Sequence, residues 1–273
     1  MKHELKTDYD IEVIADGVYK IDEFGMALCY LITGSERALL IDTGTGLGDL
    51  KGAVEKLTSL PVDVVGTHAH PDHIGGIGQW GRAYIHKEDI APVYRLLCLT
   101  FIRKALTLAG RKMTPKVVEK GITPKDVIRY KQPEIIAIEE GKIFDLGGRT
   151  VKVINVPGHT RGSVALLLEE LSIMFTGDDV NPLTWLYLPG CVSLEEWLPG
   201  AERLLKLAET YKPFYSHDLG VQSPEQMAQT IAWVKGVLAK QKKNTLLYKI
   251  RQVPEGKDLT ECLLYRTNRV YKK

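Results

Sequence analysis

Three histidines and one aspartate lie within six consecutive positions, His68 to His73, in the stretch THAHPDHIGG. The whole chain contains only seven histidines. Three imidazoles gathered without a metal ion would repel one another whenever they took up protons. Neutral imidazole and carboxylate are also the ligands that zinc and similar cations bind in proteins. The stretch therefore predicts a metal site.

The order of residues in this stretch divides its ligands into two pairs. In an extended segment, residues two apart point the same way, so His68 and His70 can reach one ion together. A proline then bends the backbone, and Asp72 and His73 point towards a neighbouring position. The two glycines that follow have no side chains to obstruct a close approach of the backbone.

Three more candidate ligands lie far along the chain. His159 follows the apolar run VKVINV, Asp178 follows IMFTG, and His217 follows FYS. Each stands directly after a predicted strand, where the loops of active sites gather. His3 and His86 are isolated, and we interpret them as structural residues.

The elements that must position these residues form two strand-rich halves. Alternating or β-branched runs predict strands at DGVYKI, ALCYLIT, RALLIDTG and VDVVGTH, and later at KIFDLGG, RTVKVINVPG, SVALLLEE and LSIMFTGD. Helical spacing appears in LGDLKGAVEKLTSL, LEEWLPGAERLLKLAETY and SPEQMAQTIAWVKGVLAKQ, and we expect edge strands at TLLYKI and ECLLYRTN. This order predicts two sheets packed together and flanked by helices, in one domain covering residues 1–273.

A helical insertion is predicted at about 87–132, between the two strand-rich halves. Its apolar residues can form a lid beside the metal site, or pack against the sandwich or a second subunit. We expect burial. The residues concerned are Leu96, Leu97, Leu99, Phe101 and Ile102.

Composition restricts the classes of partner. The formal net charge of the 273 residues is only +2, which argues against a nucleic-acid-binding surface. No apolar run approaches the ~20 residues that span a membrane, and the polar start MKHELKTDYD does not resemble a signal peptide. Four scattered cysteines fit a reducing compartment, so we expect a cytoplasmic protein without membrane partners. A homo-oligomer remains open.

The motif H-x-H-x-D-H, with its downstream ligands in order, resembles the metallo-β-lactamase-fold hydrolase superfamily. The likeness runs from ALCYLITGSERALLIDTG to YSHD. It implies an α/β fold, a four-layer αβ/βα sandwich, and a centre of two divalent ions, with zinc favoured and iron or manganese open. The resemblance implies that the first ion is held by His68, His70 and His159, and the second by Asp72, His73 and His217. It also implies that Asp178 bridges the two ions and that Asp42 supports the metal loop.

The resemblance also implies a metal-dependent hydrolase in which a hydroxide shared by the two ions attacks the substrate. Asp72 is the expected acceptor of the proton from that nucleophile. The sequence has no GxSxG elbow for a serine hydrolase. The glycine-rich run GTGLGD lacks the third glycine of a dinucleotide fingerprint, and we interpret it as a turn beside Asp42.

Departures from the family's branches restrict the substrate. A common β-lactamase subclass has cysteine at the bridging position, where this chain has Asp178, so a true β-lactamase is not expected. Lactonases of the fold have a tyrosine where Asn181 stands, and the glutathione-binding basic cluster of glyoxalase II-like thioesterases is not evident. Trp185 and Tyr187 are candidates for a pocket wall. We expect a small-molecule substrate, a partly apolar ester, thioester or lactone. A phosphodiesterase and a non-catalytic metal-dependent sensor stay as alternatives.

Overall fold

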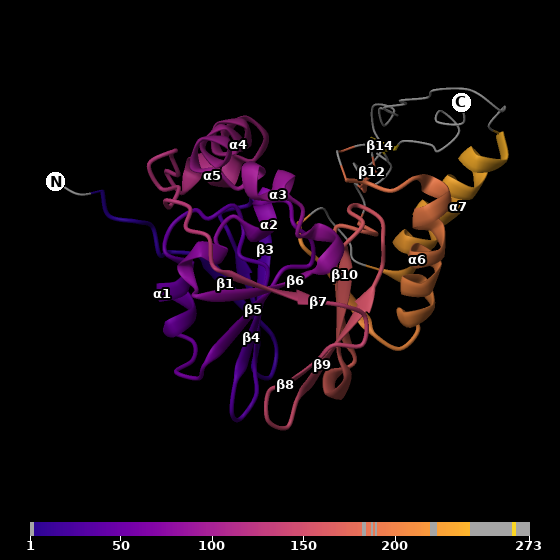
Figure 1. Ribbon diagram of the computed structural model, residues 1–273, viewed down its shortest axis with the longest axis horizontal. Helices are drawn as coiled ribbons and strands as arrows, with labels where there is room; N and C mark the ends of the chain where they lie inside the picture. Colours follow the sequence, from indigo (N-terminus) through magenta and orange to yellow (C-terminus); the bar gives the residue numbers. More distant parts are fainter. Residues whose placement is uncertain are drawn as a thin grey trace.

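Two β-sheets face each other in the centre of the molecule, and helices cover their outer faces (Figure 1). The computed structural model describes residues 3–181, 184–186, 188, 190–218, 223–240 and 264–265. Helix α1 lies outside the first sheet, and α6 and α7 lie outside the second (Figure 1). This is the predicted αβ/βα sandwich, and the predicted fold class is confirmed.

The first sheet contains seven strands in sequence order. They are β1 (Asp10–Ala15), β2 (Val18–Asp22), β3 (Leu28–Thr33), β4 (Ala38–Ile41), β5 (Val62–Val65), β6 (Arg82–His86) and β7 (Glu134–Ile138). Strands β1 to β4 pair antiparallel, and β4 to β7 pair parallel. The crossover from β4 to β5 passes through α1 (Leu50–Glu55), as a parallel connection requires.

The second sheet has five strands in the order β13-β11-β10-β9-β8. They are β8 (Ile143–Asp145), β9 (Thr150–Asn155), β10 (Val164–Leu168), β11 (Ile173–Gly177) and β13 (Lys212–Tyr215). Helix α6 (Leu194–Leu207) begins at a capping box of Ser193 and Glu196, and α7 (Pro224–Lys240) has Pro224 at its first position. The short strands β12 (Trp185–Leu186) and β14 (Leu264–Tyr265) pair with each other. The predicted edge strand TLLYKI lies outside the described residues.

The core has three apolar layers, because successive residues of a strand face opposite sides of its sheet. Tyr30 of β3 points between the sheets, where its ring lies 4.7 Å from that of Phe175. Its neighbour Leu31 points the other way and joins the cluster that contains Leu50 and Val54 of α1. A third cluster packs the outer face of the second sheet against α6 and α7. The alternation of residues along the predicted strands therefore assigns neighbouring side chains to different layers of the core, as the structure shows.

The predicted helical insertion lies between β6 and β7. Its helices stand at one end of the sandwich (Figure 1). Its helices are α3 (Pro92–Leu97), α4 (Thr100–Met113) and α5 (Pro115–Glu119), and the short α2 (Pro71–Ile74) precedes β6. Cys98, Val117 and Ile122 pack into the core of the first sheet. Among the described residues, no helix combines the length and the apolar character that crossing a membrane requires.

The burial expected for the apolar residues of this insertion, against the sandwich or a second subunit, is not provided by the sandwich for three of them. Leu96, Leu99 and Phe101 are exposed in the single chain. For Phe101 the reason is that α4 turns Arg103 and Thr107 towards the protein, so the opposite side of the helix faces outwards. These three side chains are therefore free to contact the surface of another molecule.

Candidate metal centre

The predicted ligands stand at one end of the sandwich, just after the strands of both sheets. His68 and His70 follow β5, and Asp72 and His73 lie in α2. The others follow strands of the second sheet: His159 follows β9, Asp178 follows β11 and His217 follows β13. The two halves of the sandwich thus contribute different ligands to one place.

The seven residues form three overlapping groups. Within each group, the candidate ligand atoms all lie within 4.8 Å of one another. The groups are His68, His70 and His159; His68, His73 and Asp178; and Asp72, His73 and His217. The first and third are the two sets that the family resemblance implied. The second connects them through Asp178, at the position expected of a bridging ligand.

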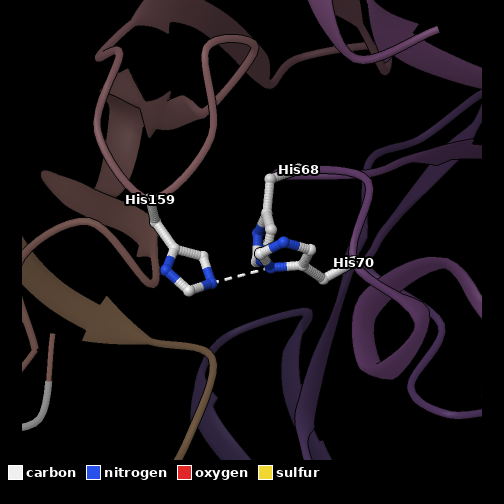
Figure 2. Close-up of side chains that lie close together, drawn as sticks. All are labelled: His68, His70 and His159. Atoms are coloured by element: carbon white, nitrogen blue, oxygen red, sulfur yellow. Dashed lines mark hydrogen bonds between the residues drawn. The ribbon is translucent and has the colours of Figure 1, made fainter. Parts of the chain in front are cut away.

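The first group is made of three imidazoles that converge from two loops (Figure 2). His70 Nδ1 lies 2.8 Å from His159 Nε2. On the far side of its ring, His159 donates from Nδ1 to the carbonyl oxygen of Trp185 at 2.6 Å. That bond leaves the lone pair of His159 on Nε2, the atom that faces the other two rings.

The second and third groups share His73 and two carboxylates. His73 Nε2 lies 3.3 Å from Asp178 Oδ2 and 3.5 Å from Asp72 Oδ2. His217 Nε2 approaches the same two oxygens, at 3.2 Å and 3.6 Å respectively. Asp178 is buried, whereas the side chain of Asp72 is 32% exposed. Asp72 is therefore the carboxylate of this cluster that solvent reaches most readily.

Three polar atoms that point into the cluster have no hydrogen-bond partner among the described residues. They are His68 Nε2, Asp178 Oδ1 and His73 Nε2, the last of which has only the ion-pair contacts with Asp72 and Asp178 described above. A buried donor or acceptor without a partner costs about 1–3 kcal/mol, so such atoms usually have one. Two imidazole nitrogens and a carboxylate oxygen are ligands for a borderline divalent cation. The donor set fits a metal ion at this place.

The electrostatics favour the metal-binding protonation states of His68, His70 and Asp178. Burial, followed by the neighbouring imidazoles, holds the pKa of His68 well below its ordinary value, and burial with His159 lowers the pKa of His70 to about 3. Burial raises the pKa of Asp178, but His217 and His73 outweigh it and hold that pKa well below the usual range. His68 and His70 are thus held as neutral imidazoles and Asp178 as an ionised carboxylate, as metal ligands must be.

His73 and His217 behave differently because they face carboxylates. Burial lowers the pKa of His73, but Asp72 and Asp178 outweigh it and hold that pKa well above its ordinary value. The pKa of His217 is raised by Asp178 in the same way, against burial. In the absence of other cations, protons balance the negative charge between these residues. A metal cation would take over that role.

Asp42 lies behind the cluster and orients two of its rings. Its carboxylate accepts hydrogen bonds from the amide of Thr67 at 2.7 Å, the hydroxyl of Thr67 at 2.9 Å and the hydroxyl of Ser216 at 3.0 Å. It also accepts from His73 Nδ1 at 3.0 Å. Because the Thr67 hydroxyl donates to Asp42, it accepts from His68 Nδ1 at 3.1 Å. Both rings therefore present Nε2 to the cluster. The structure places Asp42 where the sequence analysis expected a support for the metal loop.

Two supporting carboxylates were missed in the sequence. Asp89 accepts from the amide of Ala69 at 2.9 Å and of Gly162 at 2.9 Å, which ties the loop of His68 to the loop of His159. Asp179 accepts from the amide of His159 at 2.8 Å. Asp89 belongs to no motif, and its role depends on two loops that only the fold brings together. Asp179 stands beside Asp178, and that adjacency was the one available signal.

The turn after β4, residues 43–47, packs against the end of α2. Glu23 is buried and accepts hydrogen bonds from the amides of Thr45, Gly46 and Leu47 at 2.6–2.8 Å. A Cβ atom at Gly75 would come within 2.4 Å of the carbonyl oxygen of Thr45. The predicted need for glycine after the histidine stretch therefore has a physical cause, since α2 rests directly on this turn.

The two predicted pocket residues have different outcomes. Trp185 is half-buried, and its carbonyl oxygen binds His159, so its backbone adjoins the first group. Tyr187 lies outside the described residues. Asn181, at the position where lactonases have a tyrosine, is buried and binds Thr184 within its own loop.

Comparisons with known proteins agree with this geometry. A family model described as "Metallo-beta-lactamase superfamily" matches residues 22–209. Human acyl-coenzyme A thioesterase MBLAC2 is 29% identical over 246 residues, covering 74% of this chain and 86% of that protein. Atrochrysone carboxyl ACP thioesterase nsrC of Aspergillus novofumigatus is 30% identical over 155 residues, covering 55% of this chain and 37% of that protein.

Solved structures show the same fold. A metallo-beta-lactamase from Pontibacter korlensis matches with a TM-score of 0.59 and 20% identity, covering 84% of this chain and 99% of that one. TTHA1623, solved in a di-iron-bound form, matches with a TM-score of 0.51 and 26% identity, covering 75% of this chain and 93% of that one.

Proposed function

The chain belongs to the metallo-beta-lactamase superfamily, and from this premise we propose that it is a dinuclear-metal thioesterase that hydrolyses small, partly apolar acyl thioesters. The observation that carries the proposal is the set of three overlapping ligand groups at one end of the sandwich. Family membership and the thioesterase relatives support a metal-type hydrolase, and the relatives favour a thioester over the ester and lactone considered from the sequence.

In the proposed centre, the ligands divide as the overlapping groups do. His68, His70 and His159 would hold one ion, and Asp72, His73 and His217 would hold the second. Asp178, which lies with His68 and His73, would be shared by the two sets. When bound, two such ions lower the pKa of a shared water and polarise a carbonyl group. Imidazole and carboxylate suit zinc, and they also suit iron and manganese. The di-iron form of TTHA1623 supports keeping iron among the candidates.

We assign the proton transfer to Asp72. Its carboxylate lies next to His73 and His217, and its side chain is more exposed to solvent than that of Asp178, the other carboxylate of the cluster. It can therefore accept the proton that an attacking water loses. Asp42, Asp89 and Asp179 would then act as positioning residues, because they bind the rings or backbone of the ligands.

Hydrolysis of acyl-CoA substrates of graded chain length tests the proposal, with the released thiol as the readout. We expect turnover that a chelator abolishes and that added zinc, iron or manganese restores. Asp178→Asn should lose at least 100-fold in kcat/KM. His3→Asn is the matched control, because His3 binds Asp126 away from the ligand groups and should keep full activity.

The same assay separates the alternatives. Turnover of bis-p-nitrophenyl phosphate without thioester turnover would favour a phosphodiesterase. Tight metal binding without turnover of thioesters, esters, lactones or phosphodiesters would favour a sensor. Either result would contradict the thioesterase proposal.

A further inference from the structure

Helix α4 exposes two large apolar side chains and buries an arginine and a threonine. Arg103, Thr107 and Gly110 face the protein. Phe101 and Leu108, seven residues apart on the opposite side, are 66% and 54% exposed. A helix on the surface of a globular protein normally has the reverse arrangement. The outward side of α4 is therefore suited to contact something other than water.

The orientation of α4 is fixed by hydrogen bonds. Arg103 donates from Nε to the carbonyl oxygen of Cys98 at 2.8 Å, from Nη1 to Thr45 at 3.0 Å and from Nη2 to Ile128 at 2.8 Å. Rotating the helix to bury Phe101 would remove the guanidinium from three carbonyl groups, which is costly for a buried charge. The exposure of the apolar side thus follows from the packing of Arg103.

The exposed apolar residues are not confined to α4, because they also occur in α3 and in the turn between the two helices. We define the α3–α4 face by its exposed residues, listed here: Arg95, Leu96, Leu99, Phe101, Lys104, Leu108, Lys112 and Met113. Isolated exposed apolar residues are ordinary, but five large ones within residues 96–113 are more than chance exposure and indicate an interaction surface.

The charge of this segment is one-sided. Residues 91–118 contain six lysines and arginines and no aspartate or glutamate. Arg95, Lys104 and Lys112 point outwards, and no ion pair or hydrogen bond is found for them within the described part of the chain. An apolar surface bordered by unpaired cations fits a partner that is apolar inside and negatively charged at its boundary.

We propose that the α3–α4 face docks on an anionic lipid surface, with Phe101 and Leu108 entering the acyl boundary and Lys104 and Lys112 at the headgroups. A second copy of the chain fits less well, because a symmetric contact through this face would bring its own cations together. The proposal concerns a helix lying on a membrane and so departs from the expectation of no membrane partner, because the composition argued only against a spanning helix. It does not depend on the proposed hydrolase activity.

The face lies at the same end of the sandwich as the candidate metal centre. Figure 1 shows α3 and α4 beside α2, which carries Asp72 and His73. Arg103 also binds the carbonyl of Thr45, on which Gly75 at the end of α2 rests. Docking would therefore hold this end of the molecule, rather than the opposite one, at the lipid.

Flotation with vesicles tests the proposal without an activity readout. Phosphatidylcholine vesicles with added phosphatidylserine should bind the full chain at low salt, and pure phosphatidylcholine vesicles should not. Raising the salt should weaken binding, because it screens the headgroup charge. Phe101→Ser with Leu108→Ser, and separately Lys104→Gln with Lys112→Gln, should each lower the partition coefficient roughly tenfold.

Matched controls lie elsewhere on the surface. Val13→Ser with Ile143→Ser removes two exposed apolar side chains, and Lys51→Gln with Lys206→Gln removes two exposed charges, and both pairs should bind like the wild type. Equal binding to both kinds of vesicle, or equal loss in the controls, would overturn the proposal. A dimer of the wild type that Phe101→Ser with Leu108→Ser dissociates would assign the face to a second copy. A large fall in Tm for that variant would show instead that the face packs within the chain; the lysine pair then still tests lipid binding.

Discussion

Three imidazoles in the candidate centre are fixed from their outer sides. Thr67, Asp42 and the carbonyl of Trp185 bind the Nδ1 atoms of His68, His73 and His159. Each ring therefore presents Nε2 to the same space, before any ion is considered. Partners of this kind hold the tautomer and the orientation of metal-binding histidines, and losing one typically costs 10- to 100-fold in metal affinity.

Removing the carboxylate of Asp42 should therefore weaken metal binding without removing a ligand. We expect Asp42→Asn to lower metal affinity roughly 10- to 100-fold, measured by competition with a chromogenic chelator. Asp63→Asn is the matched control, since Asp63 is a buried carboxylate that binds Arg37 and Arg82 away from the centre. Equal affinities of Asp42→Asn and the wild type would show that Asp42 does not position His73.

Glu23 should make stability depend on pH. Burial raises its pKa to about 7 although three backbone amides oppose the shift. A carboxyl group with a folded-state pKa above its unfolded value favours the folded state while protonated, so its contribution is lost as the pH rises from about 4.5 to about 7. The loss is about 3 kcal/mol.

Urea unfolding in chelator at several pH values, for the wild type and Glu23→Gln, measures this effect. The free energy of unfolding of the wild type should fall relative to that of Glu23→Gln across this interval, because glutamine does not titrate. A difference between the two proteins that stays constant with pH would contradict the shift.

At the level of elements, the sequence predicts most of what positions the centre. The alternation in ALCYLIT and RTVKVINV places β3 and β9, and the strand-end positions of His68, His159 and Asp178 follow from where such runs stop. The orientation of α4 was not predictable, since an apolar stripe favours burial unless a buried arginine holds the helix the other way. Asp89 was missed because its partners lie on two separate loops, 20 and 73 residues away in sequence, and no local pattern encodes those contacts.

Arg103 should therefore be more important for stability than its helix position suggests. Arg103→Ala leaves the carbonyls of Cys98, Thr45 and Ile128 without their donor, and we expect a loss of about 2–4 kcal/mol in the free energy of unfolding. Lys104→Ala, the exposed neighbour, should change it by less than about 0.5 kcal/mol. Urea denaturation of both variants decides, and similar midpoints for the two would refute the anchoring role of Arg103.

At the scale of the whole molecule, the centre exists only when both sheets pack together. The loop after β5 and the short α2 supply four candidate ligands, and the loops after strands of the second sheet supply three more, His159, Asp178 and His217. The core between the sheets, with Tyr30 against Phe175, is what holds the two halves at this spacing. Family membership and the thioesterase relatives support a metal-type hydrolase. That this hydrolase is a two-ion thioesterase is our proposal.

Thioesterase turnover measured against the number of metal ions per chain tests that proposal most directly. Metal-free protein is loaded stepwise with zinc, iron or manganese, and ions per chain and acyl-CoA hydrolysis are determined on the same samples. We predict turnover that rises with loading and reaches its maximum at two ions per chain. Binding of fewer than one ion per chain, or hydrolysis that persists unchanged in metal-free protein, would contradict the account.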